Sequence, residues 1–252
     1  GGRVREGPRR DKHGCVVAVQ HIGSAANFLE RQAVRITWGA TAREMGMRLS
    51  FVVGLPEMPN ALQDAEIQSS SEMVKKGLAA EQRMHQDLIM VKIADASHAS
   101  RPKAFLTAGG LAKFAERHEL ADKQCQYLLK VNNNVYVRPS RLLALIKRVN
   151  RDPSSSPLQY IGKIWMKGRI VRDPKDRHYL SEAVLKSFGP ETMYYPPYAS
   201  GSAILMSASL VHRLVSAKFG GCYTIANLVP GPDDCQLGIC IDRLATRSDM
   251  GA

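Results

Sequence analysis

Short apolar runs rich in β-branched and aromatic residues alternate with longer segments of helical periodicity along this 252-residue chain. The apolar runs have the length of strands and end at polar, glycine or proline residues. The predicted strands cover residues 15–20, 49–54, 87–93, 127–131 and 158–165. The predicted helices cover residues 27–38, 69–84, 103–119, 140–149 and 209–217. This alternation predicts a layered α/β domain.

Two local signals bear on the ends and the stability of the predicted helices. Asn27 stands at the start of the first helical segment and is a candidate N-cap. The segment over 103–119 contains Gly109 and Gly110, and each glycine costs about 1 kcal/mol in a helix interior. We therefore expect this helix to be weak.

Two basic segments stand apart from the alternation. Residues 1–14 are polar and basic, and we expect a disordered arm in front of a single domain over residues 15–252. Residues 166–193 are basic and irregular, and we expect them to form a mobile loop.

The composition is that of a globular protein with a strong positive charge. Hydrophobic residues make up 44% of the chain, which is enough for one large domain. The formal net charge of +12 favours anionic partners: a nucleotide-sugar, an acidic glycan, a membrane surface or nucleic acid. The sequence has no RNA-binding signature and no basic groove interleaved with aromatic residues, so nucleic acid is not the expected partner.

Membrane segments and metal-binding cysteine motifs are both absent from the sequence. No stretch of about 18 uninterrupted apolar residues occurs, so no membrane-spanning helix is predicted. The chain shows no signal peptide and does not begin with Met, and we expect a fragment or a processed form. Its five cysteines include no C-x-x-C pair, which argues against a zinc site, whereas one or two disulfides stay open as alternatives.

The segment QYLLKVNNNVYVR, residues 126–138, has the most unusual polar pattern of the chain. An apolar run stops at Asn132, Asn133 and Asn134 and resumes at Val135. Asparagine breaks strands, so we predict a buried strand, a short polar turn at its end and a second extended piece. Ligands of open α/β sheets bind beyond the carboxyl ends of strands, which makes these side chains candidates for a site. The alternative is an Asn-rich turn without a ligand.

Three further segments carry recognisable patterns in addition to this one. They are NFLERQAVRITWG (27–39), YYPPYASGSAILMSASLVHRL (194–214) and PDDCQLGICIDRL (232–244). In this order, the four segments resemble motifs of the eukaryotic β-1,3-glycosyltransferase family, which includes galactosyl- and N-acetylglucosaminyltransferases and relatives of Fringe. The resemblance covers about residues 15–245. It implies the GT-A glycosyltransferase fold, with a Rossmann-like nucleotide half and a mixed central sheet, and a lumenal domain anchored in the Golgi membrane through an N-terminal segment.

The resemblance implies a divalent cation at the asparagine triplet. In the family an acidic triplet, the DxD motif, binds the cation on the diphosphate of a UDP-sugar. Asn134 stands at the position of the metal-binding aspartate. An amide offers one neutral oxygen, whereas Mn²⁺ prefers anionic oxygen ligands. Mn²⁺ is therefore the implied cofactor, and we expect its binding to be weakened or lost.

The remainder of the implied donor site lies on the first predicted helix. Arg31 and Arg35 are four residues apart and share one helix face. In the family this segment lies near the nucleotide, and two arginines could bind a diphosphate. The predicted donor-binding residues are thus these two arginines with Asn132, Asn133 and Asn134. A solvated helix face is the alternative for the arginines.

The catalytic and acceptor-binding residues are also predicted from the resemblance. Asp234 stands at the position of the family's base, which takes the proton of the acceptor hydroxyl in an inverting transfer. The alternative for Asp234 and its neighbour Asp233 is an acidic pair at the start of a helix. We expect Tyr195 and Tyr198 to form a wall of the acceptor site and Gly201 to allow close approach to a ligand. The alternative for the tyrosines is an aromatic cluster at the edge of the core.

Two functions of different classes follow. The first is transfer of galactose or N-acetylglucosamine from a UDP-sugar to a glycan acceptor in β-1,3 linkage. The second is a catalytically inactive homologue that binds a glycan or serves as a folding partner of an active glycosyltransferase. The retained Asp234 favours the first and the triplet of asparagines favours the second.

Overall fold

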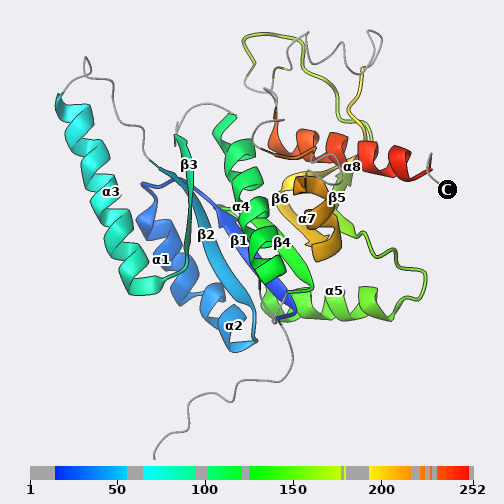
Figure 1. Cartoon of the computed structure of the whole chain (residues 1–252), viewed down its shortest axis with the longest axis horizontal. Helices are drawn as coiled ribbons and strands as arrows, with labels where there is room; N and C mark the ends of the chain where they lie inside the picture. The colour runs from blue at the N-terminus through cyan, green and yellow to red at the C-terminus, as the bar shows by residue number, and fades with distance from the viewer. Residues whose placement is uncertain are drawn as a thin grey trace, which may run out of the picture.

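Six strands form one mixed sheet in the centre of the molecule (Figure 1). The computed structural model describes residues 15–55, 65–94, 101–120, 125–176, 179, 193–216, 222–224, 228 and 232–249. The strands are β1 (Val17–Ile22), β2 (Arg48–Leu55), β3 (Leu88–Ala94), β4 (Tyr127–Asn132), β5 (Tyr160–Trp165) and β6 (Tyr198–Ser207). Their order in the sheet is β3-β2-β1-β4-β6-β5. The first four strands are parallel, and β6 runs antiparallel to both β4 and β5. The predicted α/β class and mixed central sheet of the GT-A fold are therefore confirmed.

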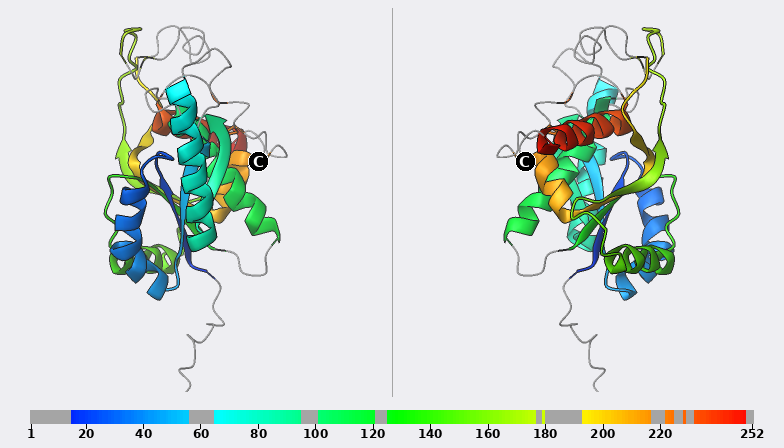
Figure 2. Two further views of the ribbon diagram at one scale, coloured as in Figure 1. Left: turned by 90° about the vertical axis from the view of Figure 1, so that its left-hand side faces the viewer. Right: turned by 90° about the vertical axis from the view of Figure 1, so that its right-hand side faces the viewer.

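Helices cover both faces of the sheet (Figures 1 and 2). One face packs against α1 (Phe28–Ile36), α2 (Trp38–Glu44), α3 (Ala65–His85) and α5 (Pro139–Arg151). The other face packs against α4 (Arg101–Leu120), α7 (Ala208–Val215) and α8 (Asp233–Asp249). Successive side chains of a strand point to opposite faces, and β1 follows this rule: Val17 and Val19 join the first core and Ala18 the second.

The antiparallel direction of β6 brings separate segments to one edge of the sheet. β4 and β6 pair from Tyr127 opposite Ser207 to Val131 opposite Ala203. The first residues of β6 therefore lie beside the carboxyl end of β4, where the asparagine triplet begins. The start of α8 packs on the same part of β6 through Gly238, where an added Cβ would lie 2.4 Å from the Cβ of Tyr198.

The predicted elements are found with shifted ends and two corrections. The helix predicted over 27–38 is divided at Thr37 into α1 and α2, because the backbone of Thr37 is not helical (φ −108°, ψ −117°). Asn27 does precede α1, but its side chain makes no capping hydrogen bond. The second extended piece, from Val135, is not a strand. The predicted arm over 1–14 lies outside the described residues.

The two glycines of α4 lie against the sheet. A Cβ on Gly109 would lie 2.5 Å from Cγ1 of Val91, and one on Gly110 would lie 2.7 Å from Oε1 of Gln20. Gln20 also donates a hydrogen bond of 2.8 Å from Nε2 to the carbonyl oxygen of Gly110. The helix forms with both glycines in its interior, and their close approach to the sheet gives a packing reason for residues of low helix propensity at these positions.

Two disulfides connect the described cysteines, which decides between the alternatives left open by the sequence. Cys15 is bonded to Cys125, and this bond joins the starts of the neighbouring strands β1 and β4. Cys222 is bonded to Cys240 of α8. Cys235 is a buried free thiol. None of the helices in the described ranges is long and apolar enough to cross a membrane.

Replacing Gly109 by alanine tests the packing of α4. The new methyl group would overlap Val91, so we expect Gly109→Ala to lower the free energy of unfolding by about 1–3 kcal/mol. Gly77→Ala in α3 is the matched control, because a Cβ on Gly77 meets nothing within 4 Å. There alanine should raise stability by about 0.5–1 kcal/mol. Urea denaturation followed by circular dichroism measures both, and a stabilising effect of Gly109→Ala would contradict the close approach.

Candidate functional site

The asparagine triplet begins at the carboxyl end of β4, as predicted, but its side chains do not act as one unit. Nζ of Lys130 donates to Oδ1 of Asn132 at 3.2 Å. Asn133 turns to α1 instead, where its Nδ2 donates to Oε2 of Glu30 at 2.9 Å. Asn134 is exposed. The first two amides therefore have partners on different elements, Lys130 of β4 and Glu30 of α1.

The partners of these amides fix which atoms remain available to a ligand. A lysine ammonium can only donate, so Oδ1 of Asn132 must face Lys130 and its NH₂ group is left over. An ionised carboxylate can only accept, so the NH₂ group of Asn133 must face Glu30 and its carbonyl oxygen is left over. Asn132 thus offers hydrogen-bond donors, which suit an anionic or hydroxyl oxygen rather than a cation.

Lys130 is a buried charge in the middle of an otherwise apolar strand. It is 1% exposed, and Nζ makes three hydrogen bonds: to Asn132, to the carbonyl oxygen of Gly201 at 2.9 Å and to Oδ2 of Asp233 at 2.9 Å. These three acceptors match the three protons of an ammonium group. Lys130 therefore connects the end of β4, the start of β6 and the start of α8.

Asp233 and Asp234 begin α8 and have different partners. Asp233 accepts from Lys130, from Oγ1 of Thr107 at 3.1 Å and from the hydroxyl of Tyr223. Asp234 accepts from the backbone N–H of Gly201 at 2.9 Å on Oδ2 and from that of Cys235 at 3.0 Å on Oδ1. Each oxygen of Asp234 keeps a further lone pair.

Gly201 lies between these two acidic residues, and its predicted approach to a ligand stays a prediction. Its N–H binds Asp234 and its carbonyl oxygen binds Lys130. A Cβ on Gly201 would lie 3.4 Å from both Cβ and Oδ2 of Asp234. The Asp234 side chain therefore lies close to the backbone of β6, at van der Waals distance from an added Cβ.

The predicted wall of the acceptor site is largely a packed aromatic cluster. Tyr195 is 5% exposed and meets Tyr198 edge to face, with 6.0 Å between the ring centroids. It belongs to a small core that also contains Ile170, Cys235 and Ile239. Burial raises the pKa of both tyrosines. The alternative of an aromatic cluster at the edge of the core is thus favoured for Tyr195, and Tyr198 is half-buried beside it.

The two predicted donor-site arginines are buried in an ion-pair network between α1 and α3. Arg31 binds Glu81 through two hydrogen bonds, of 2.8 Å from Nε and 2.7 Å from Nη2. Arg35 binds Glu81 at 2.6 Å and Asp87 at 2.7 and 2.9 Å. Arg43 is the third arginine of this network and binds Asp87 at 2.6 Å. These pairings argue against the predicted contact with a diphosphate and also against a solvated face.

Arg31 still shapes the edge of the sheet indirectly. Its guanidinium donates to the carbonyl oxygens of Ser24 at 2.7 Å and Ala25 at 3.0 Å, in the loop that follows β1. A cavity of about 290 Å³ beside it is lined mainly by apolar side chains of α1 and α3. Its charged groups, Arg31 and Glu81, are already paired, so we do not regard this cavity as the site.

A divalent cation fits the donor set at the triplet poorly. Within the described ranges no three His, Cys, Asp or Glu side chains converge on one point. Asn133 and Asn134 offer neutral carbonyl oxygens, and the ammonium group of Lys130 lies 3.2 Å from Oδ1 of Asn132. A hard cation gains little from such ligands and is repelled by the lysine.

Comparison with known proteins identifies the family. Residues 29–247 match the family model described as galactosyltransferase. The chain belongs to the galactosyltransferase family. It is 28% identical over 232 residues to the human protein named UDP-GlcNAc:betaGal beta-1,3-N-acetylglucosaminyltransferase 9, covering 91% of this chain and 52% of that one. It is 27% identical over 216 residues to mouse beta-1,3-galactosyltransferase 4, covering 74% of this chain and 50% of that one.

These matches cover only part of each relative. The chain spans about half the length of these curated relatives. Among solved structures, mouse xyloside xylosyltransferase 1 in its apo form aligns with 92% of this galactosyltransferase-family chain and with 82% of its own chain, at 13% identity and a TM-score of 0.34. That likeness is too slight to bear on the argument.

Sequence reasoning missed four residues of the site: Thr107, Lys130, Tyr160 and Tyr223. The hydroxyl of Tyr160 accepts from the N–H of Ala199 at 2.9 Å, and its pKa is raised by burial and by the nearby Asp234 and Asp233. Only Lys130 gave a signal, as a lone charge in an apolar run. The others come from segments whose approach to the triplet depends on the tertiary fold.

Neutralising Glu81 tests the buried ion-pair network. Burial alone would raise the pKa of Glu81, but hydrogen bonds from Arg31 and Arg35 lower it below its ordinary value of 4.5. We expect Glu81→Gln to lower the free energy of unfolding at neutral pH by about 3–5 kcal/mol, because two buried arginines lose a partner. Glu72→Gln is the control, since Glu72 is half-exposed on the same helix and its change should stay within about 0.5 kcal/mol.

The pH dependence gives a second readout of the same variants. A carboxylate with a lowered pKa stabilises the fold above its unfolded-state pKa, and this contribution is lost as the pH falls through its folded-state pKa. The stability difference between the parent chain and Glu81→Gln should therefore shrink as the pH falls below 4.5. Urea denaturation across this pH range measures it, and a constant difference would contradict the assignment.

Proposed function

We propose that this chain transfers galactose or N-acetylglucosamine from a UDP-sugar to a glycan acceptor in β-1,3 linkage, with inversion. Membership of the galactosyltransferase family supports glycosyl transfer in general. The observation that carries the finer proposal is the position of Asp234. Its carboxylate lies at the start of α8 and is held by the backbone of β6, at the edge of the sheet where the triplet begins.

Asp234 is suited to the role of general base. Backbone N–H groups hold one lone pair on each carboxylate oxygen, which orients the group without using all of its acceptor capacity. A free lone pair could accept the proton of an acceptor hydroxyl as the oxygen attacks the sugar. The ion pair of Asp233 with Lys130 separates the roles of the two neighbours, since Asp233 is paired with a cation whereas Asp234 is held by hydrogen bonds from Gly201 and Cys235.

The nucleotide would be bound with little help from a metal. Mn²⁺ is the cofactor that the family resemblance implies, and Asn134 is the residue whose carbonyl oxygen would hold it. The neutral amides and the neighbouring ammonium favour weak binding of a cation. The NH₂ group of Asn132 is a donor that could instead bind a phosphate oxygen directly.

A specific observation favours a second candidate function. Lys130, the cation that contacts the triplet, already makes three hydrogen bonds and is not available to a leaving diphosphate. Inverting transfer needs positive charge at that point. An inactive homologue that binds a glycan, or that assists the folding of an active glycosyltransferase, would have no such need.

The cell compartment and the membrane also enter as proposals. The two disulfides are typical of proteins that fold in an oxidising compartment. Together with the resemblance, they support a position in the Golgi lumen. We propose no nucleic-acid partner.

A turnover assay with UDP-galactose and UDP-N-acetylglucosamine tests the proposal. We expect Asp234→Asn to lower kcat by about 10²–10⁴-fold, because the acceptor hydroxyl loses its base. Asp242→Asn is the matched control: Asp242 is exposed on the same helix, and its replacement should leave kcat unchanged. Absence of turnover with either donor in the parent chain, with and without Mn²⁺, would refute transfer and favour the second candidate.

A further inference from the structure

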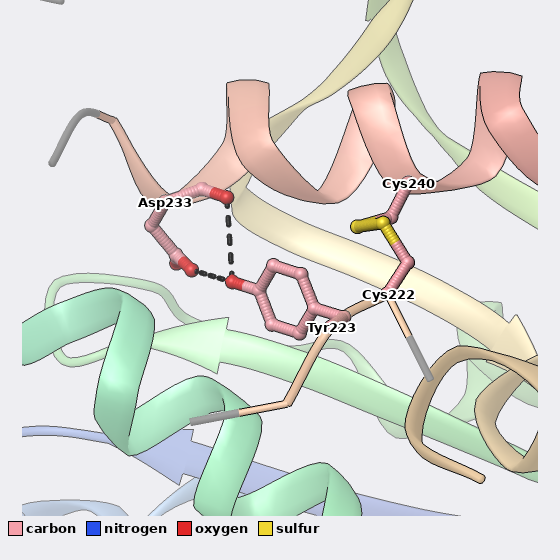
Figure 3. Close-up of a disulfide and its surroundings, with 4 residues drawn as sticks. All are labelled: Cys222, Tyr223, Asp233 and Cys240. Carbon is pink, nitrogen blue, oxygen red and sulfur yellow. Dashed lines mark hydrogen bonds between the residues drawn. A yellow bond between two sulfur atoms is a disulfide. The ribbon is translucent and has the colours of Figure 1, made fainter. Parts of the chain in front are cut away.

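Tyr223 lies between the third and fourth motif segments, which end at residue 214 and begin at residue 232, and its hydroxyl reaches the candidate site. The residue is fully buried, at 0% exposure. Figure 3 shows the ring pointing at the start of α8, where the hydroxyl donates to the carboxylate of Asp233 and lies 3.4 Å from its backbone oxygen. Burial raises the pKa of Tyr223, so the hydroxyl keeps the proton that it donates.

The backbone of Tyr223 is fixed from two sides. Its neighbour Cys222 is bonded to Cys240, further along α8 (Figure 3). Its own N–H donates to the carbonyl oxygen of Leu214 in α7 at 2.9 Å. A disulfide removes conformational freedom from the segment that it closes. The phenol is therefore presented to Asp233 from a rigid support.

A closed series of contacts leads from Tyr223 to Asp234. The hydroxyl of Tyr223 donates a hydrogen bond to the carboxylate of Asp233, and Nζ of Lys130 donates to the same carboxylate at 2.9 Å. Nζ of Lys130 also donates to the carbonyl oxygen of Gly201 at 2.9 Å, and the N–H of Gly201 donates to Oδ2 of Asp234 at 2.9 Å. The series returns to α8, because Asp233 and Asp234 are adjacent.

We propose that Tyr223 is a positioning residue, which locks the carboxylate of Asp233 and thereby keeps Lys130, Gly201 and the Asp234 carboxylate in one arrangement. The hydroxyl is the part that matters for this role. The ring alone would fill the same space in the core between α4, α7 and α8. Without the hydroxyl, one oxygen of Asp233 would lose its side-chain partner and the carboxylate could rotate.

The consequence for function rests on the proposed transfer reaction. Asp234 can act as a base only in the orientation fixed by its hydrogen bond from Gly201. If the backbone of Gly201 becomes more mobile, the rate of the chemical step should fall while the affinity for the donor stays unchanged. The consequence for structure does not depend on any activity. The N–H of Gly201 should open to solvent more often when the series is broken.

Tyr223→Phe tests this role, and Tyr127→Phe is the matched control. Tyr127 is also a buried tyrosine with a bonded hydroxyl, but its partners Asn150 and Gln159 lie at the opposite end of β4. Amide hydrogen exchange at Gly201, read by NMR on the whole chain, is the principal measurement. We expect exchange to be about tenfold faster or more in Tyr223→Phe and unchanged in Tyr127→Phe, since a hydrogen bond to a carboxylate is lost only in the first.

The outcomes separate this inference from the proposed function. Unchanged exchange at Gly201 in Tyr223→Phe, or equal acceleration of amides throughout the core, would overturn the positioning role. If the parent turns over, Tyr223→Phe should lower kcat with the KM for the donor unchanged. If the parent shows no turnover, the proposed function fails, and the exchange measurement still decides the inference. Should Tyr223→Phe not fold, Cys222→Ala combined with Cys240→Ala must show the same local acceleration, or the inference is wrong.

Discussion

The ion pair between Lys130 and Asp233 is the interaction on which the rest of the candidate site depends. It joins a central strand to a helix that begins 103 residues later in the chain. Removing two charges from water costs several kcal/mol for each ion, and good geometry with additional hydrogen bonds is needed to offset this cost. Here Asn132, Gly201, Thr107 and Tyr223 supply those bonds. The positions of these residues are therefore determined by the hydrogen bonds that the buried ion pair needs.

Much of the fold could be predicted because the inner strands β1, β2 and β4 are largely buried on both faces. Continuous apolar runs mark β1, β2, β3 and β4, and a polar break marks the end of β4. The glycines of α4 have a packing role that the sequence did not reveal. Helix propensity is a local quantity, whereas the approach of Gly109 to Val91 depends on how the helix lies on the sheet.

The candidate site was predicted only in part, and the errors of the prediction have a common origin. Spacing places Arg31 and Arg35 on one helix face, but it does not say what that face meets. Their partners Glu81 and Asp87 lie about 50 residues away and come into contact only through the packing of α1, α3 and β3. Asp234 was assigned from the family resemblance; it does lie at the start of a helix, and its role as base stays a prediction. Tyr223 carried no pattern that pointed to the site.

The hydrogen-bond partners of the asparagine triplet determine which of its polar groups are available to a ligand. Asn132 and Asn133 are held by groups of opposite charge on different elements, so they present a donor and an acceptor rather than a cluster of metal ligands. The family relationship concerns the fold and the general reaction. We propose that this edge of the sheet binds a uridine nucleotide directly, with little contribution from a divalent cation.

Titration of the chain with UDP by calorimetry, once with Mn²⁺ and once with EDTA, tests this claim most directly. We expect binding in both buffers, with dissociation constants that agree within about threefold. Asn134→Asp serves as the positive control, because a carboxylate at this position should make binding respond to Mn²⁺. Absence of UDP binding in both buffers, or binding by the parent chain only when Mn²⁺ is present, would contradict direct binding of the nucleotide without a metal.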